Sequence, residues 1–202
     1  MSAFYRDAHN HLTIDGLPLN GLMAEFGSPL YVYSGAGLER AFTTFQAAVA
    51  PVSGKVHFAL KANSALGVIA ILARCGAGAD IVSAGELARA LAAGIAAKDV
   101  VFSGVGKSAV DIRAALAAGI GQINAESAEE VAQISAVAAA MGVVAPVALR
   151  VNVDVDAGTH AKISTGQRST KFGISTNQSE AASLYASIDA NPHIKPMGLA
   201  VH

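Results

Sequence analysis

Residues 56–63 read Val56-His57-Phe58-Ala59-Leu60-Lys61-Ala62-Asn63. The first five are mostly apolar and a helical pattern follows soon after, so they predict a buried strand. A lysine at the end of such a strand is unusual, because burying an ammonium is costly unless it is paired or neutralised. A lowered pKa would make Lys61 nucleophilic and able to form a Schiff base. The alternative is a lysine whose stem lies on the strand end while its ammonium reaches water.

Beyond this stretch, apolar strand patterns alternate with Ala-rich amphipathic helix patterns. Such alternation predicts parallel strands joined by right-handed crossovers. The predicted strands are 56–60, 79–82, 100–103, 122–125, 146–153 and 197–202. The predicted helices are 65–74, 84–93, 108–118, 127–141 and 178–190. Before them, we predict a strand at 9–12, a helix at 19–26, a β-rich run at 30–33 and a helix at 38–50 capped by Ser34.

Two α/β architectures fit this pattern: an open doubly wound sheet and a closed (β/α)8 TIM-like barrel. No Gly-x-Gly-x-x-Gly follows the first strand, which weakens the dinucleotide-binding version of the open sheet. Polar residues at 103–107 and 124–127 follow strands, where barrel active sites lie. The pattern contains six strands, and a complete barrel takes about 250 residues. We therefore expect an incomplete barrel, from the front part of a longer protein or a chain cut there.

Composition restricts the function classes. Of the 202 residues, 52% are hydrophobic and 14% are charged, and the formal net charge is -1. Neither nucleic acid nor an anionic membrane is expected as a partner, because both favour a basic patch. The only cysteine is Cys75, so no intramolecular disulfide can form. Together with an N-terminus that lacks an apolar signal-peptide core, this favours a cytoplasmic protein.

Four chemically active side chains are predicted at strand ends that converge on one face of a barrel: Lys61, Asp80, Arg150 and His202. Together they could bind a phosphorylated or carboxylated ligand. Each also has a structural alternative. Asp80 and Arg150 could form a buried ion pair, and His202 could be a core histidine. Glu86, at the next strand–helix junction, could favour a helix N-terminus through the helix dipole.

The long polar stretch 152–176 is predicted to be a functional loop, with a solvated surface insertion as the alternative. Within it, Asp154, Asp156 and His160 raise the possibility of a metal site, but their spacing matches no ligand set, so no metal is predicted. The segment 103–107 resembles a phosphate loop but lacks the full Gly-x-x-x-x-Gly-Lys-[Ser/Thr] pattern.

Several motifs, in order, resemble the PLP-dependent decarboxylases that have an alanine-racemase-like barrel. They are Phe58-Ala59-Leu60-Lys61-Ala62-Asn63, the segments 78–87 and 101–107, and the start of a His-Ile-Gly-Ser segment at 200–202. The most specific match runs from Arg150 through 154–160 and 163–166 to 171–174, and it resembles the diaminopimelate decarboxylases in particular. Val153 departs from the proline usual at that position.

The resemblance implies a role for each matching residue. Lys61 would form the internal aldimine with pyridoxal 5'-phosphate, and His202 would stack on the cofactor ring. Asp80 and Arg150 would line the cofactor pocket, and Lys171 would lie in a loop that closes near the active site. The family's phosphate-binding glycines, the acidic residue facing the pyridine nitrogen and most substrate-binding groups are expected beyond residue 202.

The resemblance also implies the reaction and the assembly: decarboxylation of meso-2,6-diaminopimelate to L-lysine and CO2, in a homodimer with its active site at the subunit interface. Residues 1–30 would pack on the barrel or on a C-terminal β domain, and residues 31–202 would form the PLP-binding barrel domain. The alternatives are a truncated or non-catalytic PLP-binding barrel, a decarboxylase of another basic amino acid, and a cofactor-free Schiff-base aldolase.

Overall fold

A computed structural model of the chain describes residues 3–153, 173–175 and 180–202. The strands of its main sheet are β4 (His57–Ala59), β5 (Gly78–Ile81), β6 (Val100–Phe102), β7 (Gln122–Ala125), β8 (Ala145–Asn152), β9 (Ile174–Ser175) and β10 (Ile194–Ala200). The helices between them are α3 (Leu66–Arg74), α4 (Ala84–Ala92), α5 (Ala109–Ala118), α6 (Ala128–Met141) and α7 (Glu180–Asp189). Short 3₁₀ turns span Ala50–Val52, Leu60–Ala62 and Ala97–Asp99.

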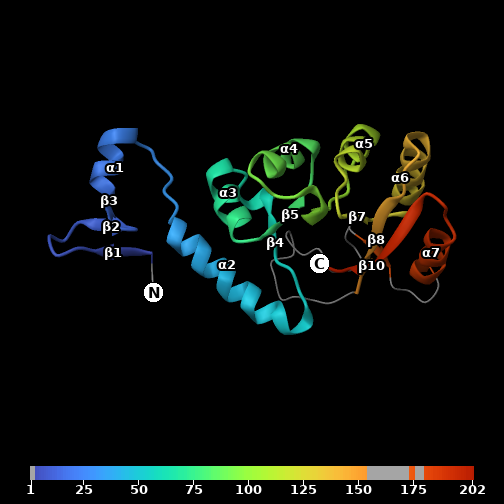
Figure 1. The fold of residues 1–202 in the computed structure, drawn as a ribbon, viewed down its shortest axis with the longest axis horizontal. Coiled ribbons are helices and arrows are strands. Elements are labelled where there is room, and N and C mark those ends of the chain that lie inside the picture. Colours follow the sequence, from blue (N-terminus) through green and yellow to red (C-terminus); the bar gives the residue numbers. More distant parts are fainter. Residues whose placement is uncertain (1–2, 154–172, 176–179) are drawn as a thin grey trace.

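The strand order decides between the two predicted architectures. The sheet runs β10-β8-β7-β6-β5-β4, with β9 beside β8, and every neighbouring pair is parallel. A doubly wound sheet reverses its order at a switch point, whereas this order follows the chain without reversal. The helices α3 to α6 follow one another along one side of the strands (Figure 1). The fold is therefore a partial α/β barrel, as predicted.

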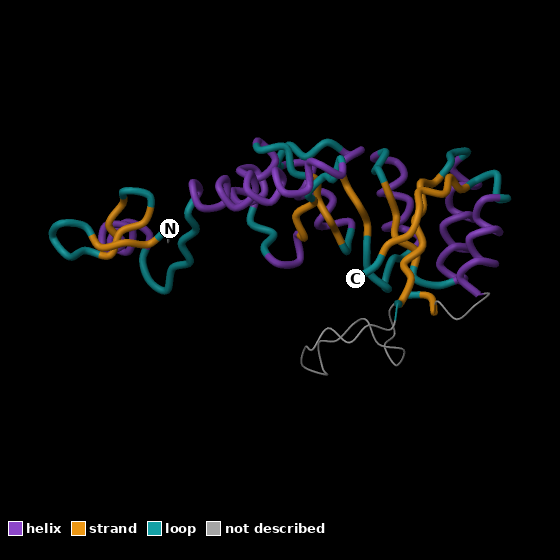
Figure 2. Tube along the Cα trace, turned by 90° about the horizontal axis from the view of Figure 1, so that it is seen from below, coloured by secondary structure: helices purple, strands orange, loops and turns teal. Residues whose placement is uncertain are grey.

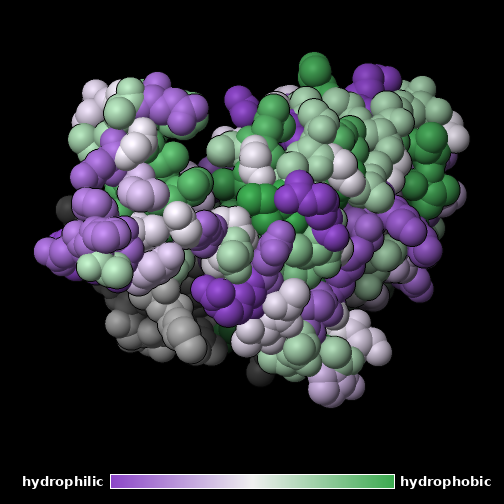
Figure 3. All heavy atoms as spheres, turned by 60° about the vertical axis from the view of Figure 1, so that its left-hand side comes forward, coloured by the Kyte–Doolittle hydropathy of each residue, from purple (hydrophilic) through white to green (hydrophobic). Residues whose placement is uncertain are grey.

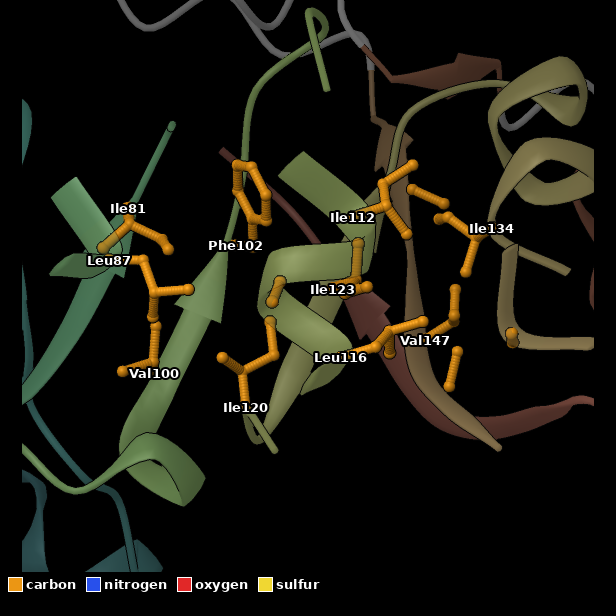
Figure 4. Close-up of a cluster of buried hydrophobic side chains, with 14 of the residues drawn as sticks. Ile81, Leu87, Val100, Phe102, Ile112, Leu116, Ile120, Ile123, Ile134 and Val147 are labelled. Carbon is orange, nitrogen blue, oxygen red and sulfur yellow. The ribbon is translucent and has the colours of Figure 1, made fainter. Parts of the chain in front are cut away.

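The core lies between the strands and these helices. Figure 4 shows Phe102, Ile123 and Val147 from successive strands facing Ile112 and Ile134 from α5 and α6. All five side chains are completely buried. Because strands buried on both faces need near-continuous apolar runs, the local sequence already placed the strands within a few residues.

Serine residues cap the helices that leave the strand ends. Ser83, Ser108 and Ser127 each accept a hydrogen bond from the backbone N–H three residues later. A capping serine satisfies a backbone donor that the helix itself leaves unpaired. Each junction between strand and helix is therefore held at a defined point, and the polar residues beside it share one end of the sheet.

The N-terminal part forms a separate small sheet of β1 (Phe4–Arg6), β2 (Leu12–Ile14) and β3 (Leu17–Pro18), followed by α1 (Leu19–Phe26) and α2 (Gly35–Val49). The small sheet and α1 stand apart from the parallel strands, with α2 between them (Figure 1). Ser34 caps α2 as predicted, because its hydroxyl accepts from the Gly37 N–H at 2.8 Å.

Two N-terminal strand predictions are wrong. Residues 9–11 of the strand predicted at 9–12 do not form one, because Asp7 Oδ1 accepts from the backbone N–H groups of His9 and His11 and holds a turn there. The strand begins instead at Leu12. Residues 30–33 are not assigned to a strand and have no partner strand within the described part of the chain, and Tyr31 is 87% exposed.

The last strand also differs from its predicted bounds. It was expected at 197–202 but covers Ile194–Ala200, so Val201 and His202 lie beyond it. Proline lacks an N–H and is confined to strand edges, first positions and bulges. Here Pro196 lies in a strand at the end of the sheet order, next to a register shift between Pro196 and Gly198.

The described helices include none with the length and hydropathy needed to cross a bilayer. Figure 3 shows hydrophilic and hydrophobic residues interspersed over one face of the molecule. Figure 2 shows the C-terminus beside the row of strands, away from the N-terminal sheet.

Candidate functional site

A cavity of about 280 Å³ lies at the carboxyl ends of the parallel strands. Its size is close to the lower end of the range for small-molecule pockets, about 300 Å³. Its polar lining comes from different strand ends and comprises Lys61, Asp80, Ser103, Asn124, Arg150 and His202. The cavity thus brings together the four predicted site residues that the structure describes.

Lys61 lies in the 3₁₀ turn Leu60–Ala62, immediately after β4. Leu60 is completely buried, whereas Lys61 is exposed and lines the cavity. The premise of a buried lysine is therefore wrong. The strand ends at Ala59. The tight turn that follows places the Lys61 side chain beyond the end of the strand, at the cavity.

Asp80 is held by a chain of hydrogen bonds across three strands. The Ser103 hydroxyl donates to Asp80 Oδ1 at 2.5 Å, and Asn124 Nδ2 donates to Ser103 Oγ at 3.0 Å. Gln122 Nε2 in turn donates to Asn124 Oδ1 at 2.7 Å. Each donor in this chain acts on the next residue toward Asp80, so the position of the carboxylate is fixed from β7 across to β5.

Arg150 pairs with Glu126 in the cavity wall. Arg150 Nη1 donates to both carboxylate oxygens of Glu126 at 3.0 Å, and both residues are buried. Glu126 Oε1 also accepts from the Gly104 N–H at 3.0 Å. Among the described residues, Arg150 forms no ion pair with Asp80, so that predicted alternative is wrong.

Lys107 is buried behind the same wall. Its Nζ donates to the carbonyl oxygens of Gly104 and Asn124, at 2.5 and 2.7 Å, and to Glu130 Oε1 at 2.7 Å. The side chain is not exposed at all, and Nζ lies 5.6 Å from the centre of the Phe102 ring. Lys107 points inward and its Nζ already has three partners, so it does not act as the lysine of a phosphate loop.

The remaining predicted residues fall into three groups: one at a helix start, one at the cavity, and several outside the described residues. Glu86 belongs to the start of α4, because its N–H donates to Ser83 Oγ and its Oε2 accepts from the Val82 N–H at 2.7 Å. His202 is exposed and lines the cavity, so it is not a core histidine. Lys171 lies outside the described residues. So do Asp154, Asp156 and His160, and the described residues include no cluster of metal-binding side chains.

The sequence placed Ser103, Asn124, Glu126 and Lys107 at the strand ends where barrel active sites lie, within 103–107 and 124–127, but it did not predict their hydrogen-bond partners. A signal for two of them was present in Gln122-Ile123-Asn124-Ala125-Glu126, where polar and apolar residues alternate. Successive strand residues point to opposite faces, so such alternation inside an otherwise apolar barrel strand indicates polar groups on the interior side. Nothing local predicted that Lys107 would turn inward.

Asp111 joins two of the loops around the cavity. Its Oδ2 accepts from the Ser108 hydroxyl at 2.5 Å, and its Oδ1 accepts from the Ala84 N–H at the start of α4. The bond from the Ser108 hydroxyl lowers the pKa of the Asp111 carboxyl below its ordinary value of 3.8. The ionised carboxylate is therefore the form that holds these two helix starts together.

Comparison with known proteins identifies the family of this fold. Residues 36–202 match the family model described as "Pyridoxal-dependent decarboxylase, pyridoxal binding domain". The chain belongs to this family. It is also 49% identical over 198 residues to a diaminopimelate decarboxylase from Pseudomonas aeruginosa, covering 98% of this chain and 47% of that protein. The corresponding protein from Haemophilus influenzae is 46% identical and is covered over 48% of its length.

Solved structures agree with this family assignment. A diaminopimelate decarboxylase from Helicobacter pylori, complexed with L-lysine, matches with a TM-score of 0.87 and 36% identity, over 91% of this chain and 46% of that one. The enzyme from M. jannaschii, also with L-lysine, matches with a TM-score of 0.91 and 30% identity, over 100% of this chain and 48% of that one. The chain spans about half the length of these relatives.

The cavity residues fit the family's cofactor, pyridoxal 5'-phosphate. The cofactor carries an aldehyde, and Lys61 provides an accessible amine at the cavity. Asp80 and Arg150 provide charged groups whose positions are already set by hydrogen bonds. The donor set therefore matches the chemistry that pyridoxal binding requires.

Proposed function

We propose that this chain provides the cofactor-binding part of an enzyme that decarboxylates meso-2,6-diaminopimelate to L-lysine and CO2. The observation that carries the proposal is the cavity that joins Lys61, Asp80, Arg150 and His202 from separate strand ends. The curated relatives with 44–49% identity, all diaminopimelate decarboxylases, support the choice of substrate.

In this mechanism Lys61 would hold the cofactor through its Nζ amine, which is accessible at the cavity, and would free it for the substrate amine. Bound pyridoxal phosphate supplies the electron sink for the pair left when the carboxylate departs as CO2. Asp80 and Arg150 line the cavity and would hold the cofactor there, each in a position set by its own hydrogen bonds. His202 would hold the cofactor ring by stacking, and Lys171, which lies outside the described residues, would act near the substrate. The reaction also needs a proton at the carbon that loses CO2, and Lys61 would be the amine that holds the cofactor again when L-lysine leaves.

The organisation of the whole protein is part of the proposal. Residues 31–202 form the PLP-binding barrel domain, and residues 1–30 pack on the barrel or on a C-terminal β domain. The active protein is a cytoplasmic homodimer whose active site lies at the subunit interface. The apolar residues exposed on the small N-terminal unit, which include Phe4, Tyr5 and Phe26, support packing of this segment against another surface.

Reductive trapping tests the cofactor site. The full gene product is mixed with pyridoxal phosphate, reduced with borohydride and digested, and the modified peptide is identified by mass. We expect a pyridoxyl group on Lys61, no label at that peptide in Lys61→Ala, and normal labelling in Lys98→Ala, which removes an exposed lysine elsewhere. Label scattered over many lysines, or absent from Lys61, would contradict the proposal.

CO2 release then tests the substrate. We expect turnover of meso-2,6-diaminopimelate well above that of L-lysine, L-ornithine or L-arginine. Preference for one of those three would favour a decarboxylase of another basic amino acid. Trapping on Lys61 without any CO2 release would favour a non-catalytic PLP-binding barrel, and trapping of a carbonyl compound without affinity for pyridoxal phosphate would favour an aldolase.

A further inference from the structure

We infer that Glu126 is a positioning residue for the cofactor site, acting through Arg150. This inference rests on the proposed function and gives a role to Glu126, which the sequence placed only among the polar residues at 124–127. Glu126 holds the Arg150 guanidinium in place at the cavity wall before any ligand enters.

The Glu126–Arg150 ion pair is buried. Glu126 is 6% exposed and Arg150 is 9% exposed. Arginine has a long side chain, and its planar head must adopt one orientation to be useful at a binding site. Both oxygens of Glu126 accept from Arg150 Nη1, so the carboxylate restricts that orientation and balances the charge.

Glu126 is itself held in place by two further hydrogen bonds. Its Oε1 accepts from the Gly104 N–H, and its own backbone N–H donates to Glu130 Oε2 at 2.7 Å. Glu130 in turn pairs with the buried Lys107, which also binds the Gly104 carbonyl. Glu126 is thus connected to the 103–107 loop and to the first turn of α6.

Glu126 connects two parts of the cavity wall. Gly104 and Arg150 both line it, and Glu126 binds both. A carboxylate that fixes two parts of one wall prepares the site in advance, which lowers the ordering cost when a ligand binds. Loss of the carboxylate would weaken the bonds to Arg150 Nη1 and to the Gly104 N–H, and so free the loop on one side.

A double-mutant cycle tests this connection. The full gene product is compared as wild type, Glu126→Gln, Arg150→Gln and the double variant, with pyridoxal phosphate titrated into each apo-protein and the dissociation constant read from cofactor absorbance. We expect Glu126→Gln to weaken binding by about tenfold, in the range found for residues that orient a ligand-binding side chain. In the Arg150→Gln background the same change should alter binding by less than about twofold.

Glu129→Gln is the matched control. Glu129 is exposed three residues along the chain, so the same charge is removed without touching Arg150. Equal losses in both backgrounds, or a loss in Glu126→Gln no larger than in Glu129→Gln, would overturn the inference while leaving the cofactor site intact. Wild-type protein that does not bind pyridoxal phosphate at Lys61 would overturn the proposed function and the inference together.

Circular dichroism checks that each variant is folded during the titration. Should Glu126→Gln not fold, Glu126→Asp replaces it in the cycle, because it keeps the charge and withdraws the carboxylate by one methylene. The same pattern is expected, with binding weakened when Arg150 is present and unchanged when it is not. A purely stabilising role would lower the unfolding midpoint without changing the dissociation constant, and that result also overturns the inference.

Discussion

Lys107 Nζ lies 2.7 Å from Glu130 Oε1, and the lysine side chain is completely buried. Two backbone carbonyl oxygens complete its hydrogen bonds. A lysine that the sequence places in a loop resembling a phosphate loop therefore connects strand ends instead of binding an anion. Its position predicts a large effect on stability.

Replacing Lys107 by methionine should lower the free energy of unfolding by about 3–5 kcal/mol, because Glu130 would lose its buried partner. Urea unfolding measures the change. The double variant Lys107→Met/Glu130→Gln should recover part of the loss, since no buried charge remains unpaired. Lys98→Met, on the exposed surface, should stay within about 0.5 kcal/mol of wild type. A Lys107→Met protein as stable as this control would contradict the buried geometry.

Gly121 packs against backbone, so a methyl group there has no space. A Cβ at position 121 would overlap the carbonyl oxygen of Lys98. We expect Gly121→Ala to destabilise the protein by about 3 kcal/mol or more, because a backbone atom cannot move aside as a flexible side chain can. Thermal or urea unfolding would detect this loss.

Gly67 provides the opposite case within the same fold. It lies in α3, with no atom within 4 Å of an added Cβ. Gly67→Ala should raise the free energy of unfolding by about 0.4–1 kcal/mol, because alanine restricts the unfolded chain. If Gly121→Ala and Gly67→Ala changed the free energy of unfolding equally, Gly121 would not pack closely against the Lys98 carbonyl oxygen.

Ser103 connects Asp80 to Asn124, and its removal should cost more than a single surface hydrogen bond. Ser103→Ala leaves Asp80 and Asn124 without that partner, so we expect a loss of about 1–3 kcal/mol in unfolding experiments. Ser103→Thr keeps the hydroxyl and should retain most of the stability. A threonine variant as unstable as the alanine variant would indicate that space, not the hydrogen bond, determines the residue at this position.

The lowered pKa of Asp111 predicts that the free energy of unfolding depends on pH. Its folded pKa is lowered, chiefly by the Ser108 hydroxyl, so the carboxylate stabilises the fold above the unfolded pKa. That contribution is lost as the pH falls below 3.8 and through the lowered folded value. Asp111→Asn should therefore be less stable than wild type by about 0.5 kcal/mol at neutral pH, the size of a charge effect at a helix N-terminus.

The two proteins should converge in stability as the solution is acidified to about pH 2. Urea unfolding at a series of pH values measures the difference directly. Asp189→Asn, at the end of α7, is a matched control, because its carboxylate lies at the helix end where the dipole disfavours negative charge. A difference for Asp111→Asn that stays constant in acid would rule out titration of Asp111 as its source.

Strand and helix positions could be predicted because their signals are local. Apolar runs, capping serines such as Ser34, and glycines after helices act within a few residues. The errors arose where a non-local or irregular contact decided the outcome. Asp7 forms a turn that replaces most of a predicted strand, and the strand containing Pro196 starts at Ile194, where it pairs with Ala145 of β8.

The sequence by itself determined the alternation of strands and helices, the resemblance to the pyridoxal-dependent decarboxylases, and the positions of Lys61, Asp80, Arg150 and His202 near strand ends. Only the tertiary structure decided which groups pair, because strands far apart in the chain must first lie side by side. Arg150 meets Glu126, 24 residues away, instead of Asp80, and Lys107 turns inward to reach Glu130. Burial then requires every charge to have a partner, and that requirement selects the pairs.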